Sequence, residues 1–350
     1  MAKNHSESGR VTIKDIARAA GVDPSTVTRA LQGSPRVKPA TRETIAALAR
    51  EMGYVPNMAA RTLVNRRSGL VGVVIPDMTN PFFRDLGRGI EDEAAKHDLR
   101  TLINDTRAVE SAERDAVSLF LELKVDGLIV PMARCPQQYY DSLPATVPVI
   151  HVNRDDAQHN VSCDTVAGSD MIMNHLVELG HRRIGFVRGP AGPVAREPKM
   201  FAYRRTLADA GIDYDPELIF SFDGKLESCE AIAEQIVSMT QRPSAVFAWN
   251  DVSAIGLIHA LRSRGVRIPE DVSIAGHDDI QLSGSVEPPL TTVSWPMYEL
   301  GVQSVRYLYS LGQGAEPGAL PVPPPQLIIR ESTGGPVAAR RGTTSSSVES

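Results

Sequence analysis

At 350 residues the chain is too long for one ordinary small domain, so two or three domains with a large core are expected. Its three cysteines, Cys135, Cys163 and Cys229, are widely spaced and form no metal-ligand pattern, which excludes a disulfide framework and indicates a reducing compartment. No apolar stretch reaches the roughly 18 residues of a membrane span, and residues 1–10 lack the apolar core of a secretion signal. A cytoplasmic protein without membrane contact is therefore predicted.

The formal charge of −5 conceals an asymmetry along the chain. Residues 1–67 hold 12 Lys and Arg against 5 Asp and Glu, whereas residues 68–350 hold 25 against 37. A basic end on an acidic body is typical of a protein that binds nucleic-acid phosphates through that end only. Each phosphate that a Lys or Arg neutralises releases counterions, and this release favours binding. The charge pattern therefore predicts nucleic-acid contact near the N-terminus.

The first helix is predicted from Thr12 onward. Apolar residues recur at i, i+3, i+4 and i+7 between Ile13 and Ala20, so they share one helix face. Thr12 and Asp15 have the spacing of a capping box, and Gly21 permits the left-handed turn that ends a helix.

A second helix, Pro24–Leu31, is predicted to begin only a few residues later, because Asp23 can cap it and proline is favoured at a first helical position. Two short helices joined by a glycine-containing turn form a helix-turn-helix, whose second helix lies in the major groove. A set of apolar side chains is expected to pack on the first helix and on a third helix at Pro39–Met52. This set comprises Val22, Val27, Ala30 and Leu31. The side chains expected to face DNA are Pro24, Ser25, Thr26, Thr28 and Arg29.

This head resembles that of the lactose/galactose repressor family, and the motifs that carry the resemblance are Thr12–Ala17, Gly21-Val22, Thr26–Arg29, Thr41-Arg42 and Gly53–Asn57. The resemblance implies that Thr12, Asn57 and Arg61 also contact DNA. It further implies that Met58–Val64, too short to be a stable helix alone, folds on DNA against its two-fold mate and wedges Leu63 into the minor groove. The alternative is that this segment is a solvated linker.

From Leu70 onward, short β-branched runs alternate with amphipathic helices, a pattern typical of parallel sheets covered by helices on both faces. Two similar doubly wound α/β lobes are therefore expected, and they resemble periplasmic sugar-binding proteins. A late strand at Gln326–Arg330 is expected to close the sheet of the first lobe. The predicted strands are Leu70–Ile75, Arg100–Ile103, Asp126–Val130, Val147–Ile150, Arg183–Val187, Ala245–Ala248 and Val272–Ala275.

These patterns predict the domain organisation from end to end. The head should span residues 11–56, the hinge and linker 57–69, and the body 70–334, between disordered tails at 1–10 and 335–350. Within the body, the first lobe should comprise about 70–163 plus 294–330, and the second about 164–293.

Ligands of open α/β sheets bind beyond the carboxyl ends of the strands, so two facing lobes predict an effector cleft between them. By the family resemblance, Phe82 and Phe83 form its apolar walls, Asn250 and Asp278 bind polar groups, and Lys199 supplies the cation. Lys199 departs from the arginine usual in the family and cannot form a bidentate fork. The predicted effector-binding set is Asp77, Phe82, Phe83, Asn153, Arg154, Lys199, Asn250 and Asp278.

Several of these side chains also have purely structural interpretations. Asn250 or Asp251 can cap the helix that begins near Val252, and we expect this of Asp251 but ligand contact of Asn250. One of Phe82 and Phe83, but not both, is expected to pack entirely inside the core.

Together these features predict a ligand-controlled repressor that binds palindromic double-stranded DNA as a homodimer. A small polar effector such as a sugar should switch this binding, and no cofactor or metal is expected. An enzyme on a doubly wound fold is the alternative, but no phosphate-binding glycine motif or nucleophile motif is present. His277 beside Asp278 is the only suggestive pair, and adjacent residues at a strand end should point apart. A cytoplasmic small-molecule-binding protein is a further alternative. A solute-binding protein that feeds a transporter is opposed by the basic head and by the lack of a secretion signal.

Overall fold

The computed structural model describes residues 11–31, 33–54, 67–154, 156–190, 197–315, 318 and 321–336. The chain divides into two compact units, a head up to Ser68 and a body from Gly69. Within the described residues no helix combines the length and apolar character that crossing a membrane requires.

The described part of the head contains three helices around one small core. Ile16, Val27 and Ile45 are its most deeply buried side chains, one from each helix, so the predicted packing of the three helices is confirmed. Leu31 is an exception, since it is 37% exposed at the end of its helix. The helices are α1 (Ile13–Ala20), α2 (Pro24–Leu31) and α3 (Pro39–Glu51).

Local interactions fix the angle between α1 and α2. The Asp15 carboxylate accepts hydrogen bonds from the backbone nitrogen and the hydroxyl of Thr12, at 2.9 and 2.7 Å. Gly21 ends α1 at φ 64°, a conformation that costs glycine nothing, and the Asp23 carboxylate then accepts from Ser25 N at 2.8 Å. The predicted turn of a helix-turn-helix is therefore present.

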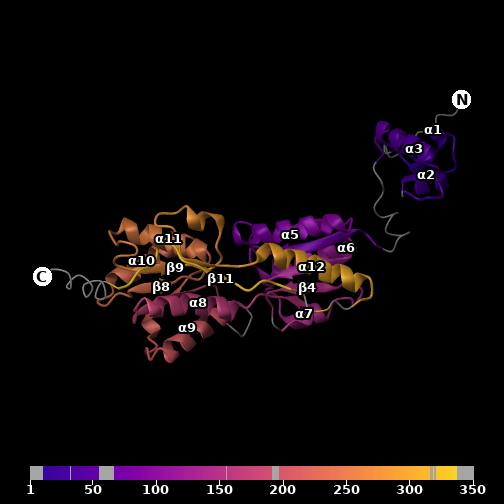
Figure 1. The fold of residues 1–350 in the computed structure, drawn as a ribbon. Helices are drawn as coiled ribbons and strands as arrows, with labels where there is room; N and C mark the ends of the chain where they lie inside the picture. The colour runs from indigo at the N-terminus through magenta and orange to yellow at the C-terminus, as the bar shows by residue number, and fades with distance from the viewer. Residues whose placement is uncertain are drawn as a thin grey trace, which may run out of the picture. The chain divides into compact units, whose positions relative to one another are not determined.

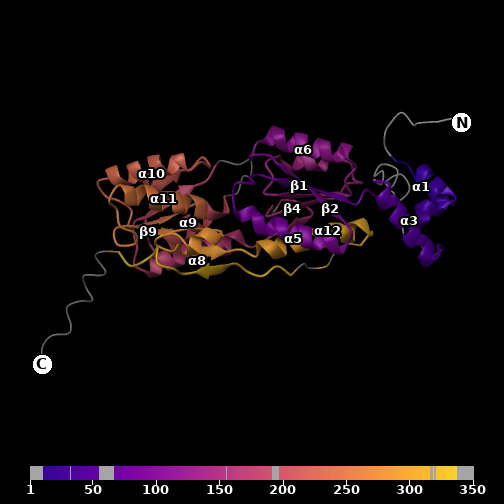
Figure 2. The ribbon, with the colours of Figure 1, turned by 90° about the horizontal axis from the view of Figure 1, so that it is seen from above.

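Lobe 1 of the body is a five-stranded parallel sheet of order β2-β1-β3-β4-β5. Side chains alternate along each strand: Val73 belongs to the cluster under α5 and α12, whereas Val74 belongs to the cluster under α6 and α7. Figure 2 shows the sheet between these two helix layers. Its elements are β1 (Leu70–Ile75), α5 (Phe82–Lys96), β2 (Arg100–Asp105), α6 (Glu110–Glu122), β3 (Gly127–Pro131), α7 (Gln137–Asp141), β4 (Val149–Val152), β5 (Asn160–Val161) and α12 (Met297–Gly312).

Lobe 2 repeats the plan with a four-stranded parallel sheet of order β7-β6-β8-β9. Helices α8 and α9 cover one face and α10 and α11 the other (Figure 1). The elements are α8 (Thr165–Glu178), β6 (Ile184–Arg188), α9 (Pro198–Asp209), η1 (Pro216–Leu218), β7 (Ile219–Ser221), α10 (Glu227–Ser238), β8 (Ala245–Phe247), α11 (Asp251–Ser263), β9 (Ser273–Ala275) and η2 (Gln281–Gly284).

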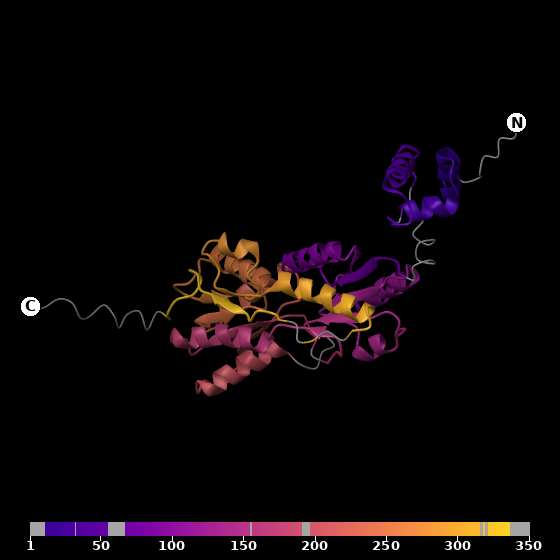
Figure 3. The ribbon, with the colours of Figure 1, turned by 45° about the vertical axis from the view of Figure 1, so that its right-hand side comes forward.

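The C-terminal segment connects both lobes (Figure 3). After β10 (Thr292–Ser294), α12 packs along α5 of lobe 1, and the chain then returns to lobe 2, where Ile274 N donates to Ser332 O at 2.8 Å. The prediction that the last strand closes the lobe 1 sheet is wrong, because β11 (Gln326–Ile328) pairs with β10 in a separate antiparallel sheet. Of the predicted tail 335–350, Gly335 and Pro336 are described and the rest lies outside the described residues.

An ion network joins α5 to α12. The buried Glu93 carboxylate accepts from Arg306 Nε at 2.8 Å and from Lys96 Nζ at 2.7 Å. Burial raises the pKa of Glu93, but the hydrogen bonds and charges of Arg306 and Lys96 outweigh burial and lower it to about 2. A carboxylate whose pKa is depressed on folding adds stability above its unfolded pKa and loses it as pH falls through its folded pKa.

We therefore expect Glu93→Gln to lower the free energy of unfolding by about 1–2 kcal/mol at pH 7, an estimate discounted for the exposure of both cations. The difference from the wild type should shrink between about pH 4.5 and 2, as Glu93 itself protonates. Urea unfolding at a series of pH values measures this difference in the free energy of unfolding. Glu91→Gln, an exposed position on the same helix, is the matched control, and equal pH profiles for both variants would refute the role of Glu93.

Candidate functional site

Helix α2 presents the predicted DNA-facing residues on its outer surface. Pro24, Ser25 and Arg29 are exposed, and Thr26 and Thr28 are half-buried, with the Thr28 hydroxyl donating to Pro24 O at 3.1 Å. Val27 and Ala30 face the core of the head instead. Thr12, the remaining described residue of the predicted DNA-binding set, is exposed at the start of α1. Asn57, Arg61 and Leu63, and with them the predicted hinge helix, lie outside the described residues.

The lobe 1 residues predicted to bind effector are mostly engaged within lobe 1. Asp77 Oδ1 accepts from the backbone nitrogen and hydroxyl of Thr79, at 2.8 and 2.6 Å, in the turn after β1. Phe82 and Phe83 stack edge to face at 5.2 Å and are 9% and 7% exposed. The expectation that only one of these phenylalanines is buried is therefore wrong. Both rings belong to a cluster that also holds Phe247 and Ile280, so the apolar core is continuous between the lobes.

The turn after β4 is also occupied by structural contacts. Asn153 adopts φ 56°, and its Oδ1 accepts from Cys163 N at 3.0 Å. The Arg154 guanidinium is buried, donates to Cys135 O at 2.8 Å and to Asp156 Oδ1 at 2.9 Å, and therefore ties two loops of lobe 1 together. Its contacts account for its burial without an effector.

Lys199 lies in the first turn of α9 and is buried in lobe 2. Its ammonium donates to Trp249 O and lies 4.3 Å from the centre of the Trp249 ring. Burial lowers the pKa of Lys199 to about 8, against the opposing charges of Asp278 and Asp251. The Trp249 contacts stabilise an ammonium that would otherwise be poorly solvated.

Asn250 and Asp251 lie at the start of α11 in different roles. Asn250 is the N-cap, and its Oδ1 accepts from Ser253 N at 2.8 Å in a capping box, so the cap belongs to Asn250 and the prediction that Asp251 caps this helix is wrong. The fully buried Asp251 carboxylate instead accepts from Ile280 N at 3.0 Å and from the hydroxyls of Ser283 and Thr292, each at 2.5 Å. It therefore fixes the loop after β9 to α11.

That loop carries His277 and Asp278, both buried. Asp278 has an unusual backbone φ of 143°, and its Oδ1 lies 3.4 Å from His277 Nδ1, so the expectation that the two side chains point apart is wrong. Burial raises the pKa of Asp278 well above its usual range, although Lys199 opposes this. Trp295 Nε1 donates to the same His277 nitrogen at 3.1 Å.

Taken together, lobe 2 places a lysine, two carboxyl groups and a histidine within electrostatic reach of one another at the carboxyl ends of β8 and β9. Such a cluster offers charged and neutral donors and acceptors to a polar ligand. Among the described residues, no group of His, Cys, Asp and Glu has the geometry to hold a metal ion.

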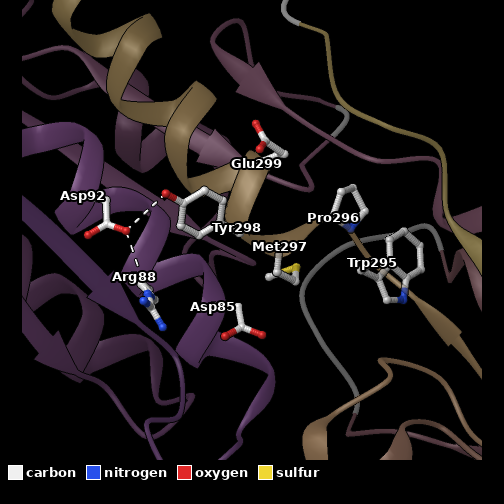
Figure 4. A pocket seen from close by; sticks show the side chains of 8 residues that line it. All are labelled: Asp85, Arg88, Asp92, Trp295, Pro296, Met297, Tyr298 and Glu299. Carbon is white, nitrogen blue, oxygen red and sulfur yellow. Dashed lines mark hydrogen bonds and ion pairs between the residues drawn. The ribbon is translucent and has the colours of Figure 1, made fainter.

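A surface pocket of about 480 Å³ lies beside this region, between α5 and the start of α12 (Figure 4). Among its lining residues, Asp92 Oδ2 accepts from the Tyr298 hydroxyl of α12 at 3.1 Å and lies 3.9 Å from Arg88 Nε on its own helix. None of the eight predicted effector residues lines it. Trp295, which donates to His277, forms one of its walls.

Two family models match the chain. One, described as "Bacterial regulatory proteins, lacI family", covers residues 12–57, and the other, described as a periplasmic binding protein-like domain, covers residues 173–333. The repressor CytR of Escherichia coli K12 is 33% identical over 327 residues, 92% of this chain and 96% of that protein. The chain belongs to the lacI family. It is accordingly a DNA-binding transcription regulator with a helix-turn-helix head and an effector-binding body.

Other relatives also match this chain over most of its length. Catabolite control protein A of Priestia megaterium is 32% identical over 308 residues, 85% of this chain and 91% of that protein. Among solved structures, the lac repressor dimer bound to operator and an anti-inducer has a TM-score of 0.82 at 27% identity, covering 93% of this chain and 100% of that one. The CelR–cellobiose complex has a TM-score of 0.68 at 28% identity, covering 92% and 100%.

Four residues in or beside the lobe 2 cluster were absent from the predicted effector-binding set: Trp249, Asp251, His277 and Trp295. Trp249 and Trp295 are the only tryptophans in the chain, and Trp249 directly precedes Asn250, which is a usable signal. Asp251 resembled an ordinary helix cap, because its partners Ser283 and Thr292 are distant in sequence. Nothing in the sequence pattern indicated that Trp295 would reach His277.

Proposed function

We propose that the protein represses transcription as a cytoplasmic homodimer on a palindromic operator, and that a small polar effector bound against the lobe 2 cluster switches this binding. The exposed polar face of α2, in a chain that aligns with a named repressor over nearly its whole length, carries the proposal. Two heads related by two-fold symmetry match the two halves of a palindrome. The effector acts through its different affinity for two conformations of the body.

The relatives indicate which partners to test. The solved lac repressor is a dimer on operator DNA, and CelR is solved with cellobiose, so operator DNA and a sugar or sugar derivative are the expected partners. An enzymatic role is not proposed, because the named relatives are regulators.

Selection of binding sequences from a random DNA pool tests the DNA-binding part of the proposal. We expect enrichment of a palindrome whose half-sites are separated by about one helical turn. Binding should weaken with added salt, since the basic head releases counterions from phosphates. Enrichment of a single unrepeated half-site would contradict the dimeric arrangement.

The predicted hinge gives a separate test. We expect Leu63→Ala to weaken specific DNA binding about ten-fold, or roughly 1.4 kcal/mol, because the apolar wedge that kinks the minor groove is truncated. Operator bending, measured by gel mobility of circularly permuted fragments, should fall as well, while dimerisation is unchanged. A variant that bends and binds like the wild type would return this segment to the linker interpretation.

A further inference from the structure

His277 is a buried histidine whose two ring nitrogens have different surroundings. The side chain is 2% exposed, lies just after β9, and has ring contacts with both Trp295 and Phe247. Nδ1 accepts a hydrogen bond from Trp295 Nε1 at 3.1 Å. Nε2 is buried and has no hydrogen-bond partner among the described residues.

The Trp295 contact determines where the ring proton lies. An indole N–H can only donate, so Nδ1 must be the unprotonated acceptor and a neutral ring carries its proton on Nε2. Asp278 Oδ1, 3.4 Å from the same Nδ1, is compatible with this tautomer when the carboxyl is protonated, and burial raises the pKa of Asp278 in that direction. Burial and the charge of Lys199 both lower the pKa of His277, which opposes a second proton.

The result is a buried N–H donor without an acceptor, and such a group is costly to leave unpaired. It lies in the same cluster as Lys199 and Asp278, at the carboxyl ends of the strands where ligands of this sheet type bind. The Lys199 ammonium and the His277 N–H can only donate, so an effector that contacts these two groups must supply acceptor atoms to them.

We propose that the Nε2–H of His277, in the tautomer fixed by the Trp295 hydrogen bond, is a specificity-determining donor of the effector site. This donor selects an effector that bears a carbonyl, carboxylate or phosphoryl oxygen. The proposal rests on the proposed effector function of lobe 2. The buried N–H should discriminate against sugars that carry only hydroxyl and ether oxygens. A hydroxyl group also carries a proton, and an ether oxygen is a weaker acceptor than a carbonyl, carboxylate or phosphoryl oxygen.

The tautomer is measured without any ligand. In long-range proton–nitrogen NMR spectra of the full-length protein, His277 Nε2 should have the chemical shift of a protonated nitrogen and Nδ1 that of an unprotonated one. Trp295→Phe should shift the ring toward a mixture of tautomers. A wild-type ring protonated on Nδ1 refutes the proposal.

Affinity is measured with four probes: gluconate, glucose 6-phosphate, uridine and cellobiose. At least one of the first three should raise the melting temperature, since a ligand that binds only the folded form stabilises it. For that probe His277→Phe should lower affinity about three- to ten-fold, the effect of losing one hydrogen bond. His151→Phe, which replaces a similarly buried histidine in β4 of lobe 1, is the matched control and should leave affinity unchanged.

The outcomes separate this proposal from the proposed function. If a probe binds the wild type and His277→Phe equally, or if cellobiose alone binds, the role of His277 is refuted while lobe 2 remains an effector site. If no probe binds, the assigned ligand class is wrong, and operator binding by the same preparation shows whether the regulatory function still stands.

Discussion

Arg29→Ala should lower the affinity of the dimer for its operator by about 2–6 kcal/mol, since each of two guanine contacts is worth about 1–3 kcal/mol. Arg29 is exposed near the end of α2, on the face that carries Ser25 and away from Val27 and Ala30, which are buried. Its side chain is exposed to solvent, so it can reach the O6 and N7 acceptors of guanine.

Fluorescence anisotropy on the selected palindrome, and on a duplex changed symmetrically at one base pair per half-site, measures this. Arg29→Ala should lose both affinity and discrimination between the two duplexes. Arg50→Ala, an exposed arginine on α3 whose Nε donates to Ala46 O, is the control and should retain the discrimination. A uniform loss on both duplexes with Arg29→Ala would instead indicate a phosphate contact.

The head could be predicted from sequence almost completely, because its determinants are local. Thr12 and Asp15 lie three residues apart, and Gly21 and Asp23 act on adjacent turns. Leu31 was misassigned as a core residue because helical periodicity does not show where the partner helices stop. At the end of α2 no described side chain covers it enough to bury it, and it remains 37% exposed.

The body was predictable at the level of strands and helices, but the pairing of its late strands was not. β11 is short, and its partner β10 lies more than thirty residues earlier, beyond the whole of α12. Hydrophobic pattern alone cannot assign such a strand to one sheet or another. The short β5 strand was missed for a related reason, since two residues carry no detectable periodicity.

The candidate site residues were likewise predictable in their position along the chain but not in their side-chain contacts. Asp77, Asn153 and Arg154 occupy the predicted strand ends, yet their side chains are engaged in turns and loop contacts within lobe 1. The lobe 2 residues form a charged cluster because Lys199, Trp249 and Asp278 meet across three separate strand-to-helix connections. The sequence placed Asp278 near a strand end, Lys199 was assigned by the family resemblance, and Trp249 was missed. Only the fold shows that these three residues face one another.

Asp278→Ala should weaken effector binding about five- to a hundred-fold, because it leaves a polar group of the effector unpaired in a buried site. Operator affinity without effector should be unchanged. Asp141→Ala, which removes a surface carboxyl group of lobe 1 on α7, is the control for a carboxyl deletion away from the lobe 2 cluster. Isothermal titration with the best-binding probe measures the effect, and wild-type affinity in Asp278→Ala would place the effector elsewhere.

Lys199 then reports the charge of the effector. For a carboxylate or phosphate ligand, Lys199→Ala should cost more than Asp278→Ala, and for a neutral ligand the order should reverse. Because the pKa of Lys199 is lowered to about 8, its ammonium loses its proton as pH rises through that value, so affinity for an anionic effector should fall between about pH 7 and 9. Lys199→Ala should abolish that pH dependence. An anionic effector whose affinity stays constant across this range in the wild type would show that the ammonium, held by Trp249, does not contact it.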